Sequence, residues 1–181
     1  MKQMKQKKGF SLIELLLVLG IIAALAITAF MIYPKVSSSN SAQTEASNIN
    51  TIKASINSLY SSSPDYSGLT TDVALNSKVF PETMVNSAGT AALNTFKGAV
   101  TIDTSNGSPS NAANSAFTIT YAAVPAAECM KIVSAVQSNF YKVSVGGTTV
   151  KSGAFTPSIF NLTTLSTECA KGNSTIVFTA N

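Results

Sequence analysis

The sequence contains no histidine, no tryptophan and no arginine, and these absences exclude several kinds of chemistry. Without histidine, neither a Ser-His-Asp nor a Cys-His catalytic arrangement can form. The two cysteines, Cys129 and Cys169, are too few ligands for a structural zinc site in a chain that has no histidine. A glycine-rich loop that would cradle a phosphate is also missing. We therefore expect a protein that is not an enzyme and needs no metal or cofactor.

Acidic residues leave one enzymatic alternative open. Beyond the N-terminal third they are scattered along the chain: Asp65, Asp72, Glu82, Asp103, Glu128 and Glu168. Folding could bring two of them together, as glycoside hydrolysis requires. We interpret them as solvated surface groups, because their positions in the sequence do not pair them.

Charged residues are scarce and unevenly placed. They make up 11% of the chain, against roughly 25% in typical soluble domains. The net charge of +4 comes from the four lysines at the N-terminus, because removing them leaves eight lysines against eight acids. A neutral remainder without arginine does not favour nucleic-acid binding. The alternative is a local lysine patch, for example Lys131, Lys142 and Lys151.

One acidic residue, Glu14, interrupts a long apolar stretch near the N-terminus. From Leu15 to Tyr33 almost every residue is apolar, and the basic segment Met1 to Lys8 precedes the stretch. An ionised carboxylate in apolar surroundings is costly unless a cation pairs with it. Cleavage after Gly9 would create such a cation, the free α-amino group of Phe10 in a neighbouring copy. The alternative is a membrane anchor whose Glu14 is incidental and reaches the interface.

The segment KKGFSLIELLLVLGII, Lys7 to Ile22, resembles the processing and assembly signature of type IV prepilins. The resemblance implies that a prepilin peptidase cleaves between Gly9 and Phe10 and that the new Phe10 amine is methylated. It also implies that Glu14 is the buried acid of the family and acts in assembly. The expected partners are further copies of the chain, the prepilin peptidase, an inner-membrane assembly platform and, before assembly, the membrane.

The expected fold is α+β, with a long N-terminal α-helix packed on a C-terminal antiparallel β-sheet. Phe10 to Tyr33 is long enough to span a membrane, and Pro34 is expected to bend or loosen the helix. An amphipathic helix follows, predicted by an apolar stripe of Ala42, Ala46, Ile49, Ile52, Ile56 and Leu59. The expected segments are a cleaved leader (1–9), an apolar helix (10–33), an amphipathic helix (34–63), a connecting region (64–95) and the sheet (96–181).

Alternating apolar residues predict the strands of that sheet. They centre on residues 96–102, 117–121, 141–145, 148–151 and 176–178. Helices are expected over 71–80, from Pro125 to about Gln137, and within 159–169. The segments 85–95 and 103–114 are rich in turn-forming residues and are predicted as loops.

Cys129 and Cys169 are expected to form a disulfide, since a pair of cysteines in an exported chain is normally oxidised. The bridge would close a loop of roughly 40 residues, worth about 3–4 kcal/mol in the chain-entropy model. The resemblance agrees, because type IV pilins carry a disulfide-closed C-terminal region. The wide cysteine spacing resembles the type IVb group, whereas the short leader and Phe10 resemble type IVa. We favour a type IVb-like head.

Together these features predict the major structural subunit of a type IV pilus, polymerised into a surface filament for adhesion, aggregation or motility. Basic residues before an apolar helix favour a cytoplasmic leader and a periplasmic head at the bacterial inner membrane, and an extracellular subunit after assembly. The alternatives are a pseudopilin of a type II secretion system and a membrane-anchored binding module that never assembles. A secretory signal cleaved near Ala24-Leu25-Ala26 is disfavoured, because the apolar run continues beyond that point.

Overall fold

The computed structural model describes residues 11–107, 111–153 and 159–181, without the side chains of residues 31–35. The chain divides into two compact units, Met1–Ser37 and Ser38–Asn181. Helix α1 (Leu12–Leu59) contributes to both. Pro34 does not end this helix, and the bend expected there stays a prediction, as does the division into five segments.

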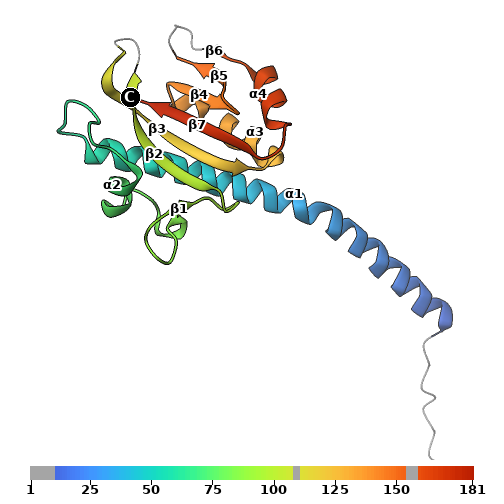
Figure 1. Cartoon of the computed structure of the whole chain (residues 1–181). Coiled ribbons are helices and arrows are strands. Elements are labelled where there is room, and N and C mark those ends of the chain that lie inside the picture. The colour runs from blue at the N-terminus through green and yellow to red at the C-terminus, as the bar shows by residue number, and fades with distance from the viewer. Residues whose placement is uncertain (1–10, 108–110, 154–158) are drawn as a thin grey trace, which may run out of the picture. The chain divides into compact units, whose positions relative to one another are not determined.

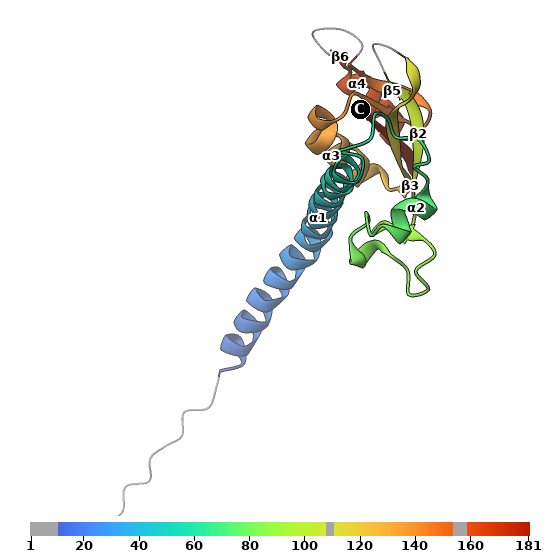
Figure 2. The same cartoon turned by 90° about the vertical axis from the view of Figure 1, so that its left-hand side faces the viewer.

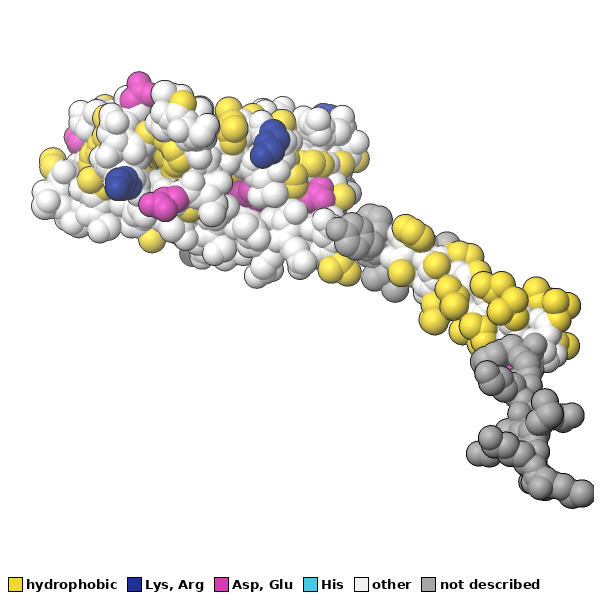
Figure 3. Space-filling model, turned by 90° about the horizontal axis from the view of Figure 1, so that it is seen from below, with side chains coloured by type: hydrophobic (Ala, Val, Ile, Leu, Met, Phe, Trp, Pro, Cys, Tyr) yellow, Lys and Arg dark blue, Asp and Glu magenta, His cyan; other side chains and the backbone are white. Residues whose placement is uncertain are grey.

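The first unit consists, where it is described, of the N-terminal part of α1. Its stretch Leu12–Phe30 has a mean hydropathy of 2.6, and none of it is buried. The stretch is long and apolar enough to cross a membrane. Figure 3 shows how hydrophobic side chains crowd its surface. Such an exposed apolar surface needs a cover, which a bilayer or other protein copies can supply.

In the second unit the C-terminal part of α1 packs against an antiparallel sheet (Figures 1 and 2). Within the described residues the strands are β1 (Ala92–Leu93), β2 (Ala99–Gly107), β3 (Ala112–Val124), β4 (Lys142–Val145), β5 (Thr148–Ser152), β6 (Ile159–Phe160) and β7 (Ser174–Ala180). Their order across the sheet is β1-β2-β3-β7-β4-β5-β6, and all neighbours are antiparallel. The C-terminal strand β7 therefore lies in the centre and joins the two halves of the sheet.

Shorter helices connect the strands. They are α2 (Thr71–Asn76), α3 (Ala126–Val136) and α4 (Leu162–Cys169), with 3-10 turns η1 (Glu82–Met84) and η2 (Gln137–Asn139). Pro125 precedes α3, where its missing N–H costs no helical hydrogen bond. The side chains of Thr70 and Asn161 accept hydrogen bonds from the first turns of α2 and α4. These caps explain why the two short helices begin where they do.

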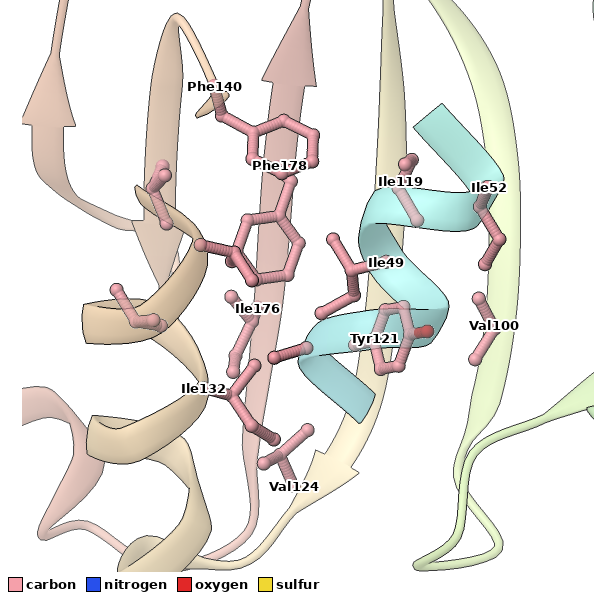
Figure 4. Packing of buried hydrophobic residues seen from close by; sticks show 14 of the residues in the cluster. Ile49, Ile52, Val100, Ile119, Tyr121, Val124, Ile132, Phe140, Ile176 and Phe178 are labelled. Carbon is pink, nitrogen blue, oxygen red and sulfur yellow. The ribbon is translucent and has the colours of Figure 1, made fainter. Parts of the chain in front are cut away.

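The hydrophobic core lies between one face of the sheet and the helices α1 and α3 (Figure 4). Ile49 and Ile52 of α1 and Ile132 of α3 are fully buried there. Tyr121 of β3 and Phe178 of β7 pack edge to face, with ring centroids 6.3 Å apart. Each such buried side chain contributes about 1.5–3 kcal/mol. The cluster therefore fixes this part of α1 on the sheet.

The apolar stripe is confirmed except at its end. Ala42, Ala46, Ile49, Ile52 and Ile56 are buried, whereas Leu59 is 43% exposed. Leu59 is the last residue of α1 and lies at the margin of the packed segment. Its inclusion in the stripe was wrong.

The predicted loop over 103–114 is wrong, and the predicted loop over 85–95 holds only the two-residue strand β1. The segment 103–114 carries the ends of β2 and β3, which pair as far as Gly107 with Ala112. Backbone groups make this pairing, so the polar side chains of the segment give no alternating apolar signal. The segment 85–95 includes β1, where Ala92 pairs with Val100 of β2. The predicted helix over 71–80 is shorter in the structure, Thr71–Asn76, and the helix after Pro125 is confirmed.

Candidate assembly and disulfide sites

Glu14 lies in the first turn of α1, close to the N-terminal end of the exposed apolar stretch. A carboxylate at this end of a helix interacts favourably with the helix dipole. Its side chain is exposed, and within the described residues it forms no ion pair. Gly9 and Phe10 lie outside the described residues, so their roles stay predictions.

Cys129 of α3 and Cys169 of α4 form the predicted disulfide, with 5.7 Å between their Cα atoms. Both cysteines are buried. Because α3 packs on the core and Cys169 ends α4, the bridge anchors α4 to the core just before the chain enters β7. The disulfide thus restrains the segment of the chain that leads into the central strand β7.

A buried acid strengthens the same connection. Glu168 is only 7% exposed and accepts a hydrogen bond from Lys171 Nζ at 2.7 Å. The hydroxyl of Ser174 donates to the main-chain oxygen of Glu168 at 3.2 Å. Glu128 in α3 is also buried, so the interpretation of all these acids as solvated surface groups was wrong for two of them. Among the residues that the structure describes, no three acids or cysteines come together as a metal site.

One buried contact, made by Glu45 on the apolar face of α1, was not predicted from the sequence. The side chain is fully buried. Its Oε1 accepts hydrogen bonds from the N–H of Thr95, at 2.6 Å, and from the Thr95 hydroxyl, while Oε2 accepts one from Asn48 at 3.3 Å. These hydrogen bonds compensate for the loss of hydration on burial. Glu45 therefore ties α1 to the turn between β1 and β2.

The position of Glu45 in the sequence could have predicted that this acid is buried. Glu45 lies three residues after Ala42 and directly before Ala46, inside the apolar stripe. An acid on the buried face of an amphipathic helix requires partners from another element.

Burial and the neighbouring Glu45 carboxylate both raise the pKa of Tyr121, whose phenol therefore stays protonated.

The turn that presents Thr95 is held by Asn94 and Gly98. The Asn94 side chain accepts hydrogen bonds from Phe96 N and Gly98 N and donates one to the oxygen of Ala122 at 2.8 Å. A Cβ atom at Gly98 would lie 1.8 Å from that oxygen, so only glycine fits. The contacts of Asn94 and Gly98 thus hold the turn that carries Thr95.

The alternative of a free lysine patch receives little support. Lys151 is 5% exposed and donates hydrogen bonds to the main-chain oxygens of Gln137 and Phe140. Lys131 donates to the hydroxyls of Ser38 and Ser39 at 3.1 and 3.0 Å. These lysines are held by contacts within the chain instead of forming one cationic surface.

A pH titration tests the environment of Lys151. Burial, and secondarily the nearby Lys53 ammonium, lower the pKa of Lys151 below 10.5. Between the lowered pKa of the folded state and 10.5, the unfolded chain binds more protons at Lys151 than the folded chain does. The contribution of Lys151 to the unfolding free energy therefore increases as the pH rises through this window. We expect the unfolding free energy of the wild type, relative to Lys151→Met, to increase over this window in denaturant titrations. A constant difference would contradict the assigned environment.

Removing Lys53 provides a second test of that environment. In Lys53→Met the repulsion from Lys53 is gone, and the pKa of Lys151 is expected to move back towards its ordinary value. NMR titration of the Lys151 side chain measures this directly. Lys78→Met, on the exposed surface, should leave the titration of Lys151 unchanged.

Comparisons with known proteins match both parts of the chain. A family model described as PilS N terminal matches residues 39–181, and the prokaryotic N-terminal methylation motif matches residues 4–30. Among solved structures, TcpA, a type IV pilin from Vibrio cholerae El Tor biotype, superposes with a TM-score of 0.57 at 22% identity and covers 78% of this chain and 99% of its own. A type IVb pilin from Salmonella typhi gives a TM-score of 0.58 at 20% identity, covering 77% of this chain and 99% of its own. At these identities the likeness concerns the fold.

The chain is also similar to a curated relative, the major structural subunit of the bundle-forming pilus of Escherichia coli O127:H6. The two are 30% identical over 102 residues, 56% of this chain and 53% of the relative. The match thus spans about half the length of that relative. The family model, by contrast, covers most of this chain. The chain therefore belongs to the PilS N terminal family and is a type IV pilin with a IVb-like fold.

Proposed function

We propose that this chain is the major structural subunit of a type IV pilus and has no enzymatic role. The observation that carries the proposal is the exposed apolar stretch Leu12–Phe30, joined in one continuous helix to a disulfide-bridged head. A membrane anchor alone explains the stretch but not its N-terminal methylation motif. Polymerisation explains both, because the stretches of many copies can cover one another.

Processing is the first step of the proposed pathway. A prepilin peptidase cleaves between Gly9 and Phe10 and methylates the new amine, which agrees with the motif at residues 4–30. The basic leader lies in the cytoplasm and the head in the periplasm before assembly. Removing the leader leaves a chain whose lysines and acids balance.

Assembly follows through the apolar helix. An inner-membrane platform, driven by a separate extension ATPase, moves the subunit from the bilayer into a helical filament. Packing of the apolar segments supplies the main attraction, at about 25 cal/mol for each Å² buried. Glu14 pairs with the Phe10 amine of an adjacent subunit and thereby sets the alignment. In the extracellular filament the heads surround the helical core and present loops for adhesion, aggregation or motility.

A substitution at Gly9 tests the processing step. Gly9→Leu should prevent cleavage, because a large side chain at the position before the cut blocks access of the peptidase. The uncleaved precursor should then accumulate in the membrane, as measured by intact-mass spectrometry of the purified chain. Gly20→Leu is the matched control, since a Cβ atom added at Gly20 has no other atoms within 4 Å apart from the neighbouring helix backbone. Mature protein from Gly9→Leu would show that the cleavage site is misassigned.

Two measurements separate the proposal from its alternatives. An N-terminus at methylated Phe10 would eliminate the non-assembling binding module, which should keep its leader. Electron microscopy of material sheared from cells would then distinguish long surface filaments from the short assemblies of a secretion pseudopilin. A processed chain that never appears in long filaments would overturn the role as major pilus subunit.

A further inference from the structure

Asn106 and Gly107, at the end of β2, form the one Asn-Gly pair in the sequence. Glycine leaves its own backbone nitrogen unhindered, so this pair allows that nitrogen to attack the preceding asparagine side chain most easily. The Asn106 side chain is exposed. Water can therefore reach the amide, and ammonia can leave from it into solvent.

The pairing of β2 with β3 is irregular at this position. Ser105 faces Ala116 and Gly107 faces Ala112, and the register shifts between them. Asn106 thus lies at an irregularity where the ladder does not assign it a facing residue. A regular strand would hold the asparagine extended, which keeps its side chain away from the next nitrogen. The irregularity relaxes that restraint.

A hydrogen bond holds the attacking nitrogen. Gly107 N–H donates to the hydroxyl of Ser115 at 2.8 Å, and that hydroxyl donates to the oxygen of Ala112 at 2.7 Å. The nitrogen has to leave Ser115 before it can reach the Asn106 side chain. The hydrogen bond to Ser115 therefore slows the reaction.

We propose that Asn106 is a site of spontaneous deamidation, at a rate set by opening of the Gly107–Ser115 hydrogen bond. The Gly107 nitrogen attacks Cγ of Asn106 and forms an N–Cγ bond. The Cγ–Nδ2 bond breaks, and Nδ2 leaves as ammonia with the proton from Gly107. Water then opens the cyclic imide at either carbonyl and gives aspartate or isoaspartate. The reaction needs no enzyme, oxidant or reductant.

The product changes the charge of the subunit. The chain that begins at Phe10 carries equal numbers of lysines and acids, so one new carboxylate gives it a net negative charge. In this consequence alone the inference rests on the proposed function, because the leader must first be removed. A filament would repeat the new charge in every converted subunit.

The test follows the purified full-length chain in detergent during incubation at neutral pH. Peptide mapping by mass spectrometry should detect conversion of Asn106, and isoelectric focusing should detect an acidic form that migrates with Asn106→Asp. Ser115→Ala should convert about two- to tenfold faster, the factor that one hydrogen bond contributes. Asn106→Gln should not form the acidic species.

Controls exclude a general loosening of the fold. Ser138→Ala removes another exposed serine hydroxyl and should leave the rate at Asn106 unchanged. A synthetic peptide with the sequence of residues 103–112 gives the rate without the hydrogen bond to Ser115. The proposal is overturned if Asn106 stays intact in both wild type and Ser115→Ala while the peptide converts. It is also overturned if Ser115→Ala reacts at the wild-type rate.

Discussion

Replacing Glu14 with alanine should abolish filament formation while leaving cleavage, methylation and folding of the head intact. The variant keeps the apolar stretch, so the membrane anchor and the packing surface survive. The Phe10 amine of the neighbouring subunit, however, would have to be buried without a counter-ion. Breaking a buried ion pair in this way costs about 3–5 kcal/mol. That corresponds to an association roughly 10²–10⁴-fold weaker at each contact.

The measurement is the yield of sheared filaments per cell, with mass spectrometry of the N-terminus on the same cells. Glu82→Ala is the matched control, because Glu82 is an exposed acid of the head and is expected to leave the yield unchanged. Glu14→Gln keeps the shape of the side chain without its charge and should fail like Glu14→Ala. Normal filament yield from Glu14→Ala would refute the pairing role and favour an incidental acid that reaches the interface.

Loss of the disulfide should destabilise the head strongly. In the variant with both Cys129→Ser and Cys169→Ser, the unfolded chain regains the freedom of a loop with a sequence separation of 40. The chain-entropy model assigns such a loop about 3–4 kcal/mol. For a unit of this size the melting temperature should fall by about 10 °C. Circular dichroism melts of the two proteins measure the difference.

Reduced wild-type protein is an independent version of the same experiment and should melt close to the double variant. Ser134→Ala, an exposed substitution on α3, controls for effects of changing that helix. If the double variant had the same melting temperature as the oxidised wild type, the bridge would contribute nothing to the stability of the head.

Local patterns in the sequence predicted much of this molecule. The apolar stretch, the stripe on α1 and the helix after Pro125 each follow from residues within a few positions of one another. The alternation at 117–121 predicted β3 for the same reason. Where polar residues line both faces of a strand, as at the hairpin end of β2 and β3, the local pattern was silent and the prediction was wrong.

The sequence by itself determined which segments are apolar enough to leave water, where the two cysteines stand and which acid lies in the apolar N-terminus. Only the tertiary structure decided that β7 lies between β3 and β4 and that Glu45 of α1 meets Thr95, fifty residues away. The reason is physical: periodicity records how each segment divides between water and core. It does not record which distant backbone or side chain completes a hydrogen bond, because that choice minimises the free energy of the whole packed unit.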